Sequence, residues 1–143
     1  MKKILSLDLG ARRIGVAISD GDIVGNLPVI DSRNREEAIA HILEIVRNED
    51  VDKIVLGLPV GQNNSEDIVR SFALELNKII DIPIVFEDET LTSKEAERIL
   101  ENSKLNPKSE KYKQEIDKIS AKLILEQYLK KWILKNIKNY ILL

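Results

Sequence analysis

The sequence contains no cysteine and a single histidine, His41. Without cysteine there can be no disulfide and no thiolate metal site, and one histidine excludes a zinc site built from several imidazoles. Long apolar runs are also missing: Asp8 interrupts the N-terminal stretch MKKILSLDLG, well short of a signal peptide or a membrane span. We expect a cytoplasmic protein with no membrane partner, whose catalysis would have to use carboxylates, hydroxyls, lysines or arginines.

Neither sign of charge dominates. The 143 residues hold 22 lysines and arginines against 24 acids, a formal charge of −2, so the strongly basic balance of a dedicated nucleic-acid coat is missing. A chain of this length with 43% hydrophobic residues can build one core, and we expect a single domain over residues 1–143. Composition alone leaves the partner open.

Five apolar runs are typical of strands. Residues 3–9 and 14–19 flank the short sequence GARR, which predicts an antiparallel hairpin. Residues 25–30 are expected to form a third strand, with Pro28 favouring an edge position. The runs KIVLGLPV, at 53–60, and IPIVFED are bounded by polar loops, as buried parallel strands are. The fold class is therefore α/β, with a mixed sheet of four or five strands covered by helices on both faces.

Capping residues and apolar periodicity predict four helices. The expected starts are Asn34 paired with Glu37, Ser65, and Thr92 paired with Glu95, and a last helix is expected over 114–134. In the third helix, Ala96, Ile99 and Leu100 have the spacing of a buried face. The polar, lysine-rich stretch 101–115 contains Pro107 and is predicted to be a mobile loop.

Asp8 is a carboxylate inside an otherwise apolar strand. With a period of two, Ile4, Ser6 and Asp8 share one face, and the leucines between them share the other. An ionised carboxylate inside a sheet is costly unless it is paired or holds a metal ion. A structural ion pair with Arg12 or Arg13 is one explanation. A catalytic or metal site is the other, and it requires further acids.

Further acids stand at two places in the chain. The run IPIVFED leads into Glu87, Asp88 and Glu89, and because alternate strand residues face opposite sides, only some of them can meet Asp8. Asp117 lies on the last predicted helix, at the border of its apolar face. Each place also has a simpler explanation. The acids at 87 to 89 could be a solvated strand end, and Asp117 could be an acid that the dipole of a helix N-terminus favours. Together, the acids indicate one shared site.

Carboxylates without histidine or cysteine suit a hard cation such as Mg²⁺ or Mn²⁺, which prefers oxygen ligands. Such an ion can lower the pKa of a bound water, and a second ion can stabilise the leaving oxygen of a phosphodiester. The sequence therefore favours hydrolysis of a nucleic-acid backbone as the reaction class.

Four stretches, LDLGARRIGVAISD, IVLGLPV, EDETLTSKEAE and IDKISAKLILEQYL, resemble in order and spacing the motifs of the YqgF family, the RuvX-like Holliday junction resolvases and pre-16S rRNA nucleases. The resemblance covers nearly the whole chain. It implies an RNase H-like fold and a metal-dependent endonuclease. The implied role is maturation of the 5′ end of small-subunit rRNA, with Holliday junction resolution as a further activity, so the substrate would be precursor rRNA or branched DNA.

The resemblance also implies the site residues. Carried over to this sequence, the catalytic residues are Asp8, Asp117 and an acid of the pair formed by Asp88 and Glu89. The implied metal ligands are Asp8, Glu89 and Asp117, holding Mg²⁺ or Mn²⁺. Thr90 stands where the family usually has an arginine, which removes a potential phosphate contact.

Basic residues near these motifs are candidate contacts to nucleic acid. Between Lys104 and Lys138, ten lysines oppose four acids, a local charge of +6, and lysines near a phosphate-cleaving site attract and position the backbone. A solvated helix surface explains the same lysines equally well. The candidates for contacts to nucleic acid are Arg12, Arg13, Lys94 and Lys118.

The C-terminal sequence WILKNIKNYILL is apolar for an exposed terminus. Ile133, Leu134, Ile137, Tyr140 and Ile141 recur at helical spacing, with lysines opposite. This tail could dock onto its own domain, form a dimer contact or lie on a membrane surface, and we expect the first of these. We expect the protein to be a monomer or weak homodimer.

Two other classes fit part of the pattern. An actin-like or sugar-kinase ATPase also places a nucleotide loop after a D-x-G hairpin, but it needs two such domains and a second phosphate loop. A non-catalytic nucleic-acid-binding scaffold could keep the same fold without cutting. Binding of divalent ions distinguishes a nuclease from such a scaffold, which has no need to hold the acids together.

Overall fold

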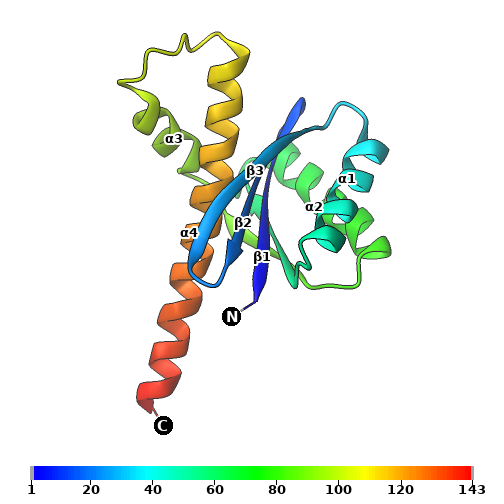
Figure 1. Ribbon diagram of the computed structural model, residues 1–143, viewed down its shortest axis with the longest axis vertical. Coiled ribbons are helices and arrows are strands. Elements are labelled where there is room, and N and C mark those ends of the chain that lie inside the picture. Colours follow the sequence, from blue (N-terminus) through cyan, green and yellow to red (C-terminus); the bar gives the residue numbers. More distant parts are fainter. Residues whose placement is uncertain (1, 143) are drawn as a thin grey trace.

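The computed structural model describes residues 2–142, which fold into a five-stranded sheet with helices on both sides (Figure 1). The strands are β1 (Lys3–Leu9), β2 (Arg13–Asp20), β3 (Ile23–Asp31), β4 (Lys53–Leu58) and β5 (Ile84–Asp88), and the helices are α1 (Arg35–Asn48), α2 (Asn63–Ile79), α3 (Thr92–Leu100) and α4 (Glu110–Leu142). The strand order is β3-β2-β1-β4-β5. Strands β1, β2 and β3 pair antiparallel, whereas β4 runs parallel to β1 and β5 runs parallel to β4. The predicted mixed α/β sheet is confirmed.

The predicted hairpin and edge strand are also confirmed. β1 and β2 pair in continuous register from Lys3 opposite Asp20 to Leu9 opposite Ile14. Pro28 lies in β3, the edge strand, where the ladder with β2 is interrupted by a register shift. A proline is tolerated there because an edge strand has one side free of ladder hydrogen bonds.

The two faces of the sheet are covered by different helices (Figure 1). On one face, aliphatic side chains of the strands pack against α1 and α2 in the larger core, which includes Leu5, Leu7, Val16, Leu56, Ile42, Phe72 and Leu76. On the other face, α4 crosses the sheet over a smaller core that includes Ile4, Ala17, Val55, Ala121, Ile124 and Leu125. The alternation predicted for β1 therefore holds, with its leucines on the α1 and α2 side and Ile4 on the α4 side.

Only one of the three predicted side-chain caps forms. The Asn34 Oδ1 atom accepts a hydrogen bond from the Glu37 backbone N–H at 3.1 Å, as predicted. The predicted Ser65 cap is wrong, because α2 begins two residues earlier, after a turn at Gly61 with φ of 84°. There the Gly61 N–H donates to the Glu66 carboxylate at 3.3 Å.

The predicted capping box at Thr92 is wrong as well. Thr92 is already inside α3, and its hydroxyl donates backwards to the Glu89 carbonyl at 3.0 Å. Of the expected buried face of this helix, Ala96 is buried and Leu100 is half-buried. Ile99 was expected to face inward, but its side chain is exposed.

α4 is longer than predicted at both ends. It begins at Glu110 rather than 114, because the Ser109 Oγ atom caps it by accepting from the Tyr112 N–H at 3.1 Å. The turn-rich connection is therefore shortened to 101–109, and its mobility stays a prediction.

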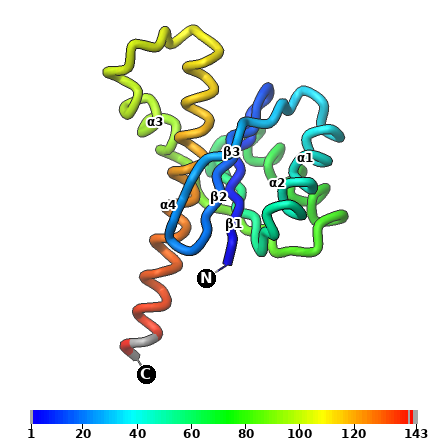
Figure 2. Tube along the Cα trace, viewed as in Figure 1, coloured from blue at the N-terminus to red at the C-terminus, as the bar shows by residue number. Residues whose placement is uncertain are grey.

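The C-terminal tail continues α4 as one helix that projects past the sheet (Figure 2). The expectation that it docks onto its own domain is wrong, because Leu134, Ile137 and Ile141 are exposed. The side chain of Tyr140 lies outside the described residues. Among the described helices, none combines the length and apolar character needed to cross a membrane.

Candidate active site

Asp8 lies near the carboxyl end of β1, between glycines of both neighbouring strands. Gly15 of β2 is its direct partner, and Gly57 of β4 follows Leu56, the partner of Leu7. A methyl group on Gly15 would come within 2.1 Å of the Asp117 carbonyl oxygen, and one on Gly57 within 2.7 Å of Glu89 Oε2. The two glycines therefore form a notch around Asp8, into which α4 and the Glu89 side chain fit.

Glu89 is the acid that reaches Asp8 from the end of β5. Its backbone N–H donates to the Leu58 carbonyl at 3.1 Å, which fixes it beside the end of β4. Its carboxyl group is in hydrogen-bonding contact with that of Asp8. The sequence left Asp88 and Glu89 as alternatives, and the structure brings Glu89 into the notch.

Asp88 lies on the opposite side and is exposed. Its carboxylate accepts from the Thr90 backbone N–H at 2.8 Å and from the Thr90 hydroxyl. These hydrogen bonds lower the pKa of Asp88. Asp88 is therefore an ionised carboxylate at the strand end, and its hydrogen bonds are made to the turn that follows the strand.

The contact between Asp8 and Glu89 changes how both acids ionise. Burial raises the pKa of Asp8 well above its ordinary value, and the negative charge of Glu89, its hydrogen bond and the charge of Asp117 raise it further. Burial also raises the pKa of Glu89. Two acids this close retain a proton more readily than separate carboxyls do, and a cation would replace that proton.

Asp117 approaches the notch from α4, but its carboxylate is held by an arginine. Its Oδ2 atom accepts from Arg13 Nε at 2.7 Å, and Arg13 Nη1 also contacts Glu110 at 2.9 Å. Burial raises the pKa of Asp117, while Arg13 opposes the shift. Among residues 2–142, no three acids or histidines are already arranged around a common point to hold a cation. Asp8 and Glu89 form a pair, and Asp117 lies next to them, hydrogen-bonded to Arg13.

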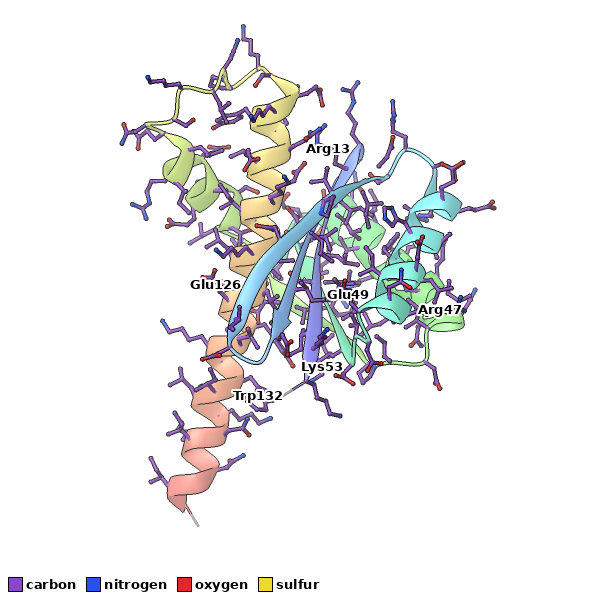
Figure 3. The ribbon with its side chains drawn as sticks, viewed as in Figure 1. Arg13, Arg47, Glu49, Lys53, Glu126 and Trp132 are labelled. Atoms are coloured by element: carbon purple, nitrogen blue, oxygen red, sulfur yellow. The ribbon has the colours of Figure 1, made fainter. Side chains whose placement is uncertain are left out.

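The explanation of Asp8 as the partner of an arginine is wrong. Within the described part of the chain, Arg13 pairs with Asp117 and Glu110, and Arg12 reaches Glu110 at 3.5 Å, but neither pairs with Asp8. Figure 3 shows Arg13 beside the N-terminal half of α4.

The predicted nucleic-acid contacts differ in how free they are. The Arg12 side chain is 68% exposed and that of Arg13 is 16% exposed, so Arg12 can meet a phosphate and Arg13 is committed to the protein. Lys118 lies 3.7 Å from Glu115 on the same helix. Lys94 is exposed on α3, at the rim of a hollow between α3 and the start of α4.

The sequence pattern identified Glu87 only as a candidate acid and did not predict the contacts by which Glu87 and two side chains of α4 support the end of β5. Glu87 is buried, and its Oε2 atom accepts from Gln127 at 2.8 Å and from Lys131 at 2.6 Å. Gln127 also donates to the Asp88 carbonyl at 2.9 Å. α4 thus holds the strand end that presents Glu89. The period of two, which places Glu87 and Glu89 on one face, was the available signal.

The mixed five-stranded sheet with helices on both faces is an RNase H-like fold. Over 91% of this chain and 99% of the other, the fold is similar to that of the fowlpox virus Holliday junction resolvase, with a TM-score of 0.53 at 15% identity. That likeness concerns the fold alone.

Sequence comparison identifies the family. The model of the RuvX family, described as Holliday junction resolvase, matches residues 2–131, and the chain belongs to this family. It is 42% identical over 132 residues to a protein of Chloroflexus aurantiacus named "Putative pre-16S rRNA nuclease", covering 88% of this chain and 85% of the relative. A relative of the same name from Roseiflexus sp. is 38% identical, covering 89% of this chain and 93% of the relative. The predicted family resemblance is confirmed.

Proposed function

We propose that the protein is a divalent-metal-dependent endonuclease that hydrolyses phosphodiester bonds in precursor rRNA, at the 5′ end of the small-subunit rRNA. The observation that carries the proposal is the carboxyl pair of Asp8 and Glu89 in a notch between two glycines, with Asp117 adjacent. The names of the relatives support precursor rRNA as substrate. Branched DNA, which the family description names, is the second candidate.

The donor set of the notch fits a hard cation. Asp8 and Glu89 offer carboxylate oxygens, the ligands that Mg²⁺ and Mn²⁺ prefer. A bound cation relieves the repulsion between the two carboxylates when both are ionised. Asp117 is the third proposed ligand once its carboxylate leaves Arg13. When bound, such an ion supplies an activated water and neutralises charge on the phosphate.

The chain's own residues account for the remaining tasks. Arg13 holds Asp117 beside the notch in the absence of a ligand. Arg12, exposed at the turn after β1, is placed to attract the phosphate backbone. Gln127 and Lys131 hold the end of β5, so Glu89 stays directed at Asp8.

The test compares cleavage of three end-labelled substrates: a precursor rRNA fragment, a four-way DNA junction and a single-stranded RNA. Each is incubated with Mn²⁺, with Mg²⁺ and with chelator. We expect metal-dependent cleavage of the precursor fragment, and a loss on the order of 10³-fold or more in Asp8→Asn, because the uncharged amide is a poorer ligand. Asp20→Asn is the matched control, since Asp20 is exposed at the far end of β2.

Three results would overturn parts of the proposal. Cleavage that persists in chelator or in Asp8→Asn contradicts the metal-bound notch. Cleavage of the DNA junction without cleavage of the RNA substrates identifies branched DNA, and not precursor rRNA, as the substrate. Binding of RNA without Mn²⁺ binding, measured by calorimetry, and without cleavage identifies the non-catalytic scaffold instead.

A further inference from the structure

The C-terminal part of α4 carries an apolar surface that the proposed active site does not use. Ile133, Leu134, Ile137 and Ile141, here called the apolar stripe, are between 38% and 73% exposed. The family match ends at residue 131, so the stripe lies beyond the part of the chain that the family model describes. An exposed apolar surface of this kind on a soluble domain marks an interaction site.

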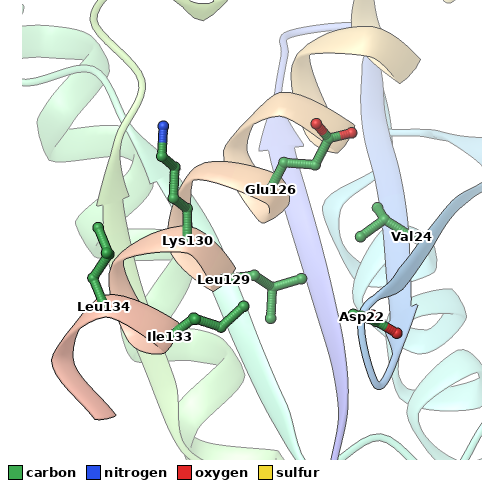
Figure 4. A pocket seen from close by; sticks show the side chains of 7 residues that line it. All are labelled: Asp22, Val24, Glu126, Leu129, Lys130, Ile133 and Leu134. Carbon is green, nitrogen blue, oxygen red and sulfur yellow. The ribbon is translucent and has the colours of Figure 1, made fainter. Parts of the chain in front are cut away.

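The stripe continues into a groove on the body of the protein (Figure 4). The groove has a volume of about 270 Å³ and is formed where α4 passes the tip of the β2–β3 hairpin. Its lining comprises Asp22, Val24, Glu126, Leu129, Lys130, Ile133 and Leu134. The floor is thus aliphatic. Two acids, Asp22 from the hairpin and Glu126 from α4, and one base, Lys130, lie at its edges, which gives the groove a net negative charge.

The charges of the groove and the tail are complementary. The tail from Lys130 to Ile141 contains four lysines and no acid, whereas the exposed residues Asp22 and Glu126 border the groove. An apolar partner with basic side chains therefore complements the groove. The tail of another copy of this chain has both properties.

We propose that two copies of this chain associate through antiparallel pairing of the C-terminal parts of α4, with the tail of each copy in the groove of the other. A two-fold axis near Leu134 places Ile137 and Ile141 of one copy opposite residues 126–131 of its partner. At a rise of about 1.5 Å per residue, Lys138 of one copy then lies within about one helical turn of Glu126 in the other. Each contact occurs twice, because a two-fold interface uses the same patch on both subunits.

This pairing leaves the proposed active site open. Asp117 and Ile137 are 20 residues apart on one continuous helix, which at about 100° per residue turns their side chains about 200° away from each other. Asp117 lies beside the notch, so the Ile137 side chain points away from the proposed active site. The inference therefore does not depend on the proposed nuclease function.

A second copy explains the surface better than an anionic membrane does. Amphipathic helices bind such membranes through an apolar face flanked by lysines, which the tail has. Asp22 and Glu126 lie on the same surface, however, and would be repelled by anionic lipid headgroups. The same two acids attract the lysines of a second tail.

The first test is sedimentation velocity of the full chain over protomer concentrations from about 1 to 200 µM. We expect a concentration-dependent dimer with Kd on the order of 10 µM, and at least about a tenfold increase in Kd for Ile137→Glu. Leu74→Glu is the control, because Leu74 is also an exposed aliphatic residue, on α2, at 67% against 50% for Ile137. A wild-type protein that stays monomeric throughout, or a dimer unchanged by Ile137→Glu, overturns the proposal.

The second test examines the charge contact. Glu126→Lys and Lys138→Glu should each weaken the dimer several-fold, and the double variant should restore it. Failure of the double variant to recover overturns the proposed register. Co-sedimentation with vesicles of phosphatidylserine and phosphatidylcholine completes the test. Vesicle binding by a monomer, lost in Ile137→Glu, overturns the dimer in favour of a lipid surface.

Discussion

The two faces of the sheet differ in what their side chains do. On the α1 and α2 face, the strands contribute leucine, isoleucine and valine to a continuous core. On the α4 face, the same strands contribute glycines, serines and acids beside a smaller core. Ser6, between Leu5 and Leu7, donates its hydroxyl to the Ala121 carbonyl at 2.7 Å.

Within a single strand, residues on one face stabilise the fold and residues on the other face form the candidate site. Because neighbouring residues of β1 point to opposite faces, Leu7 can anchor the fold while Asp8, one residue later, lies in the notch. Small side chains on the α4 face let the helix approach closely enough to bring Asp117 near. The buried leucines on the other face supply the stability that a cluster of acids reduces.

The largest effect is expected on the α1 and α2 face. Leu7 is fully buried, and Leu7→Ala should lower the free energy of unfolding by about 3 kcal/mol through lost burial and the cavity left behind. Denaturant unfolding measures the loss. Cleavage per folded molecule should stay close to that of the parent. A loss below about 1 kcal/mol would show that this face is not the principal core.

Gly57→Ala should affect cleavage more than stability. The new methyl group would meet Glu89 Oε2 at 2.7 Å and Ile124 Cδ1 at 2.6 Å, both of them ends of side chains and not backbone atoms. We expect cleavage to fall by about tenfold, equivalent to about 1.4 kcal/mol, while the melting temperature changes little. Gly25→Ala is the control, because a methyl group there meets nothing within 4 Å. Equal activity of the two variants would argue against the notch.

Asp8→Asn should stabilise the metal-free protein by about 1 kcal/mol at pH 7. The folded state raises the pKa of Asp8 above the value of 3.8 that applies to the unfolded chain. Folded protein therefore binds this proton more tightly, and the parent loses stability as pH rises from about 3.8 through the raised pKa. The advantage of Asp8→Asn should vanish near pH 3.8 and below. Thermal melts in chelator across this range check it, and destabilisation at pH 7 would contradict it.

The smallest effect is expected at Ser120. Its hydroxyl is buried and has no hydrogen-bond partner among the described residues, and such a group costs free energy that an alanine would not. Ser120→Ala should stabilise the protein by about 0.5 to 1 kcal/mol, as measured by denaturant unfolding. Ser6→Ala is the contrasting variant, because Ser6 makes a buried hydrogen bond, and it should destabilise.

The sequence predicted the strands better than the helix starts. Strand alternation and the short GARR turn reflect burial on a sheet, which a local pattern records. The starts of α2 and α3 depended on Gly61 and on the Thr92 hydroxyl bonding backwards to Glu89. Capping patterns alone do not distinguish these arrangements from a standard cap.

The candidate site was predictable in its acids but not in their partners. Strand and helix patterns supplied Asp8, Asp117 and the acids at 87 to 89, and the family resemblance narrowed the last group to Asp88 and Glu89. The choice of Glu89 rests on the turn in which Thr90 binds Asp88, and the contact of Arg13 with Asp117 joins residues 104 positions apart. Interactions over such distances in the chain depend on the packing of α4 against the sheet.

In the chain, α4 follows all five strands, and this order determines when the site can be completed during synthesis. Residues 8 and 89 are already made when the sheet is complete, but the face that holds them stays uncovered until α4 has been translated and has packed across it. Because the chain is synthesised from its N-terminus, Asp117 is the last of the three acids to be made. A nascent chain therefore cannot assemble its complete set of acids until α4 has been synthesised.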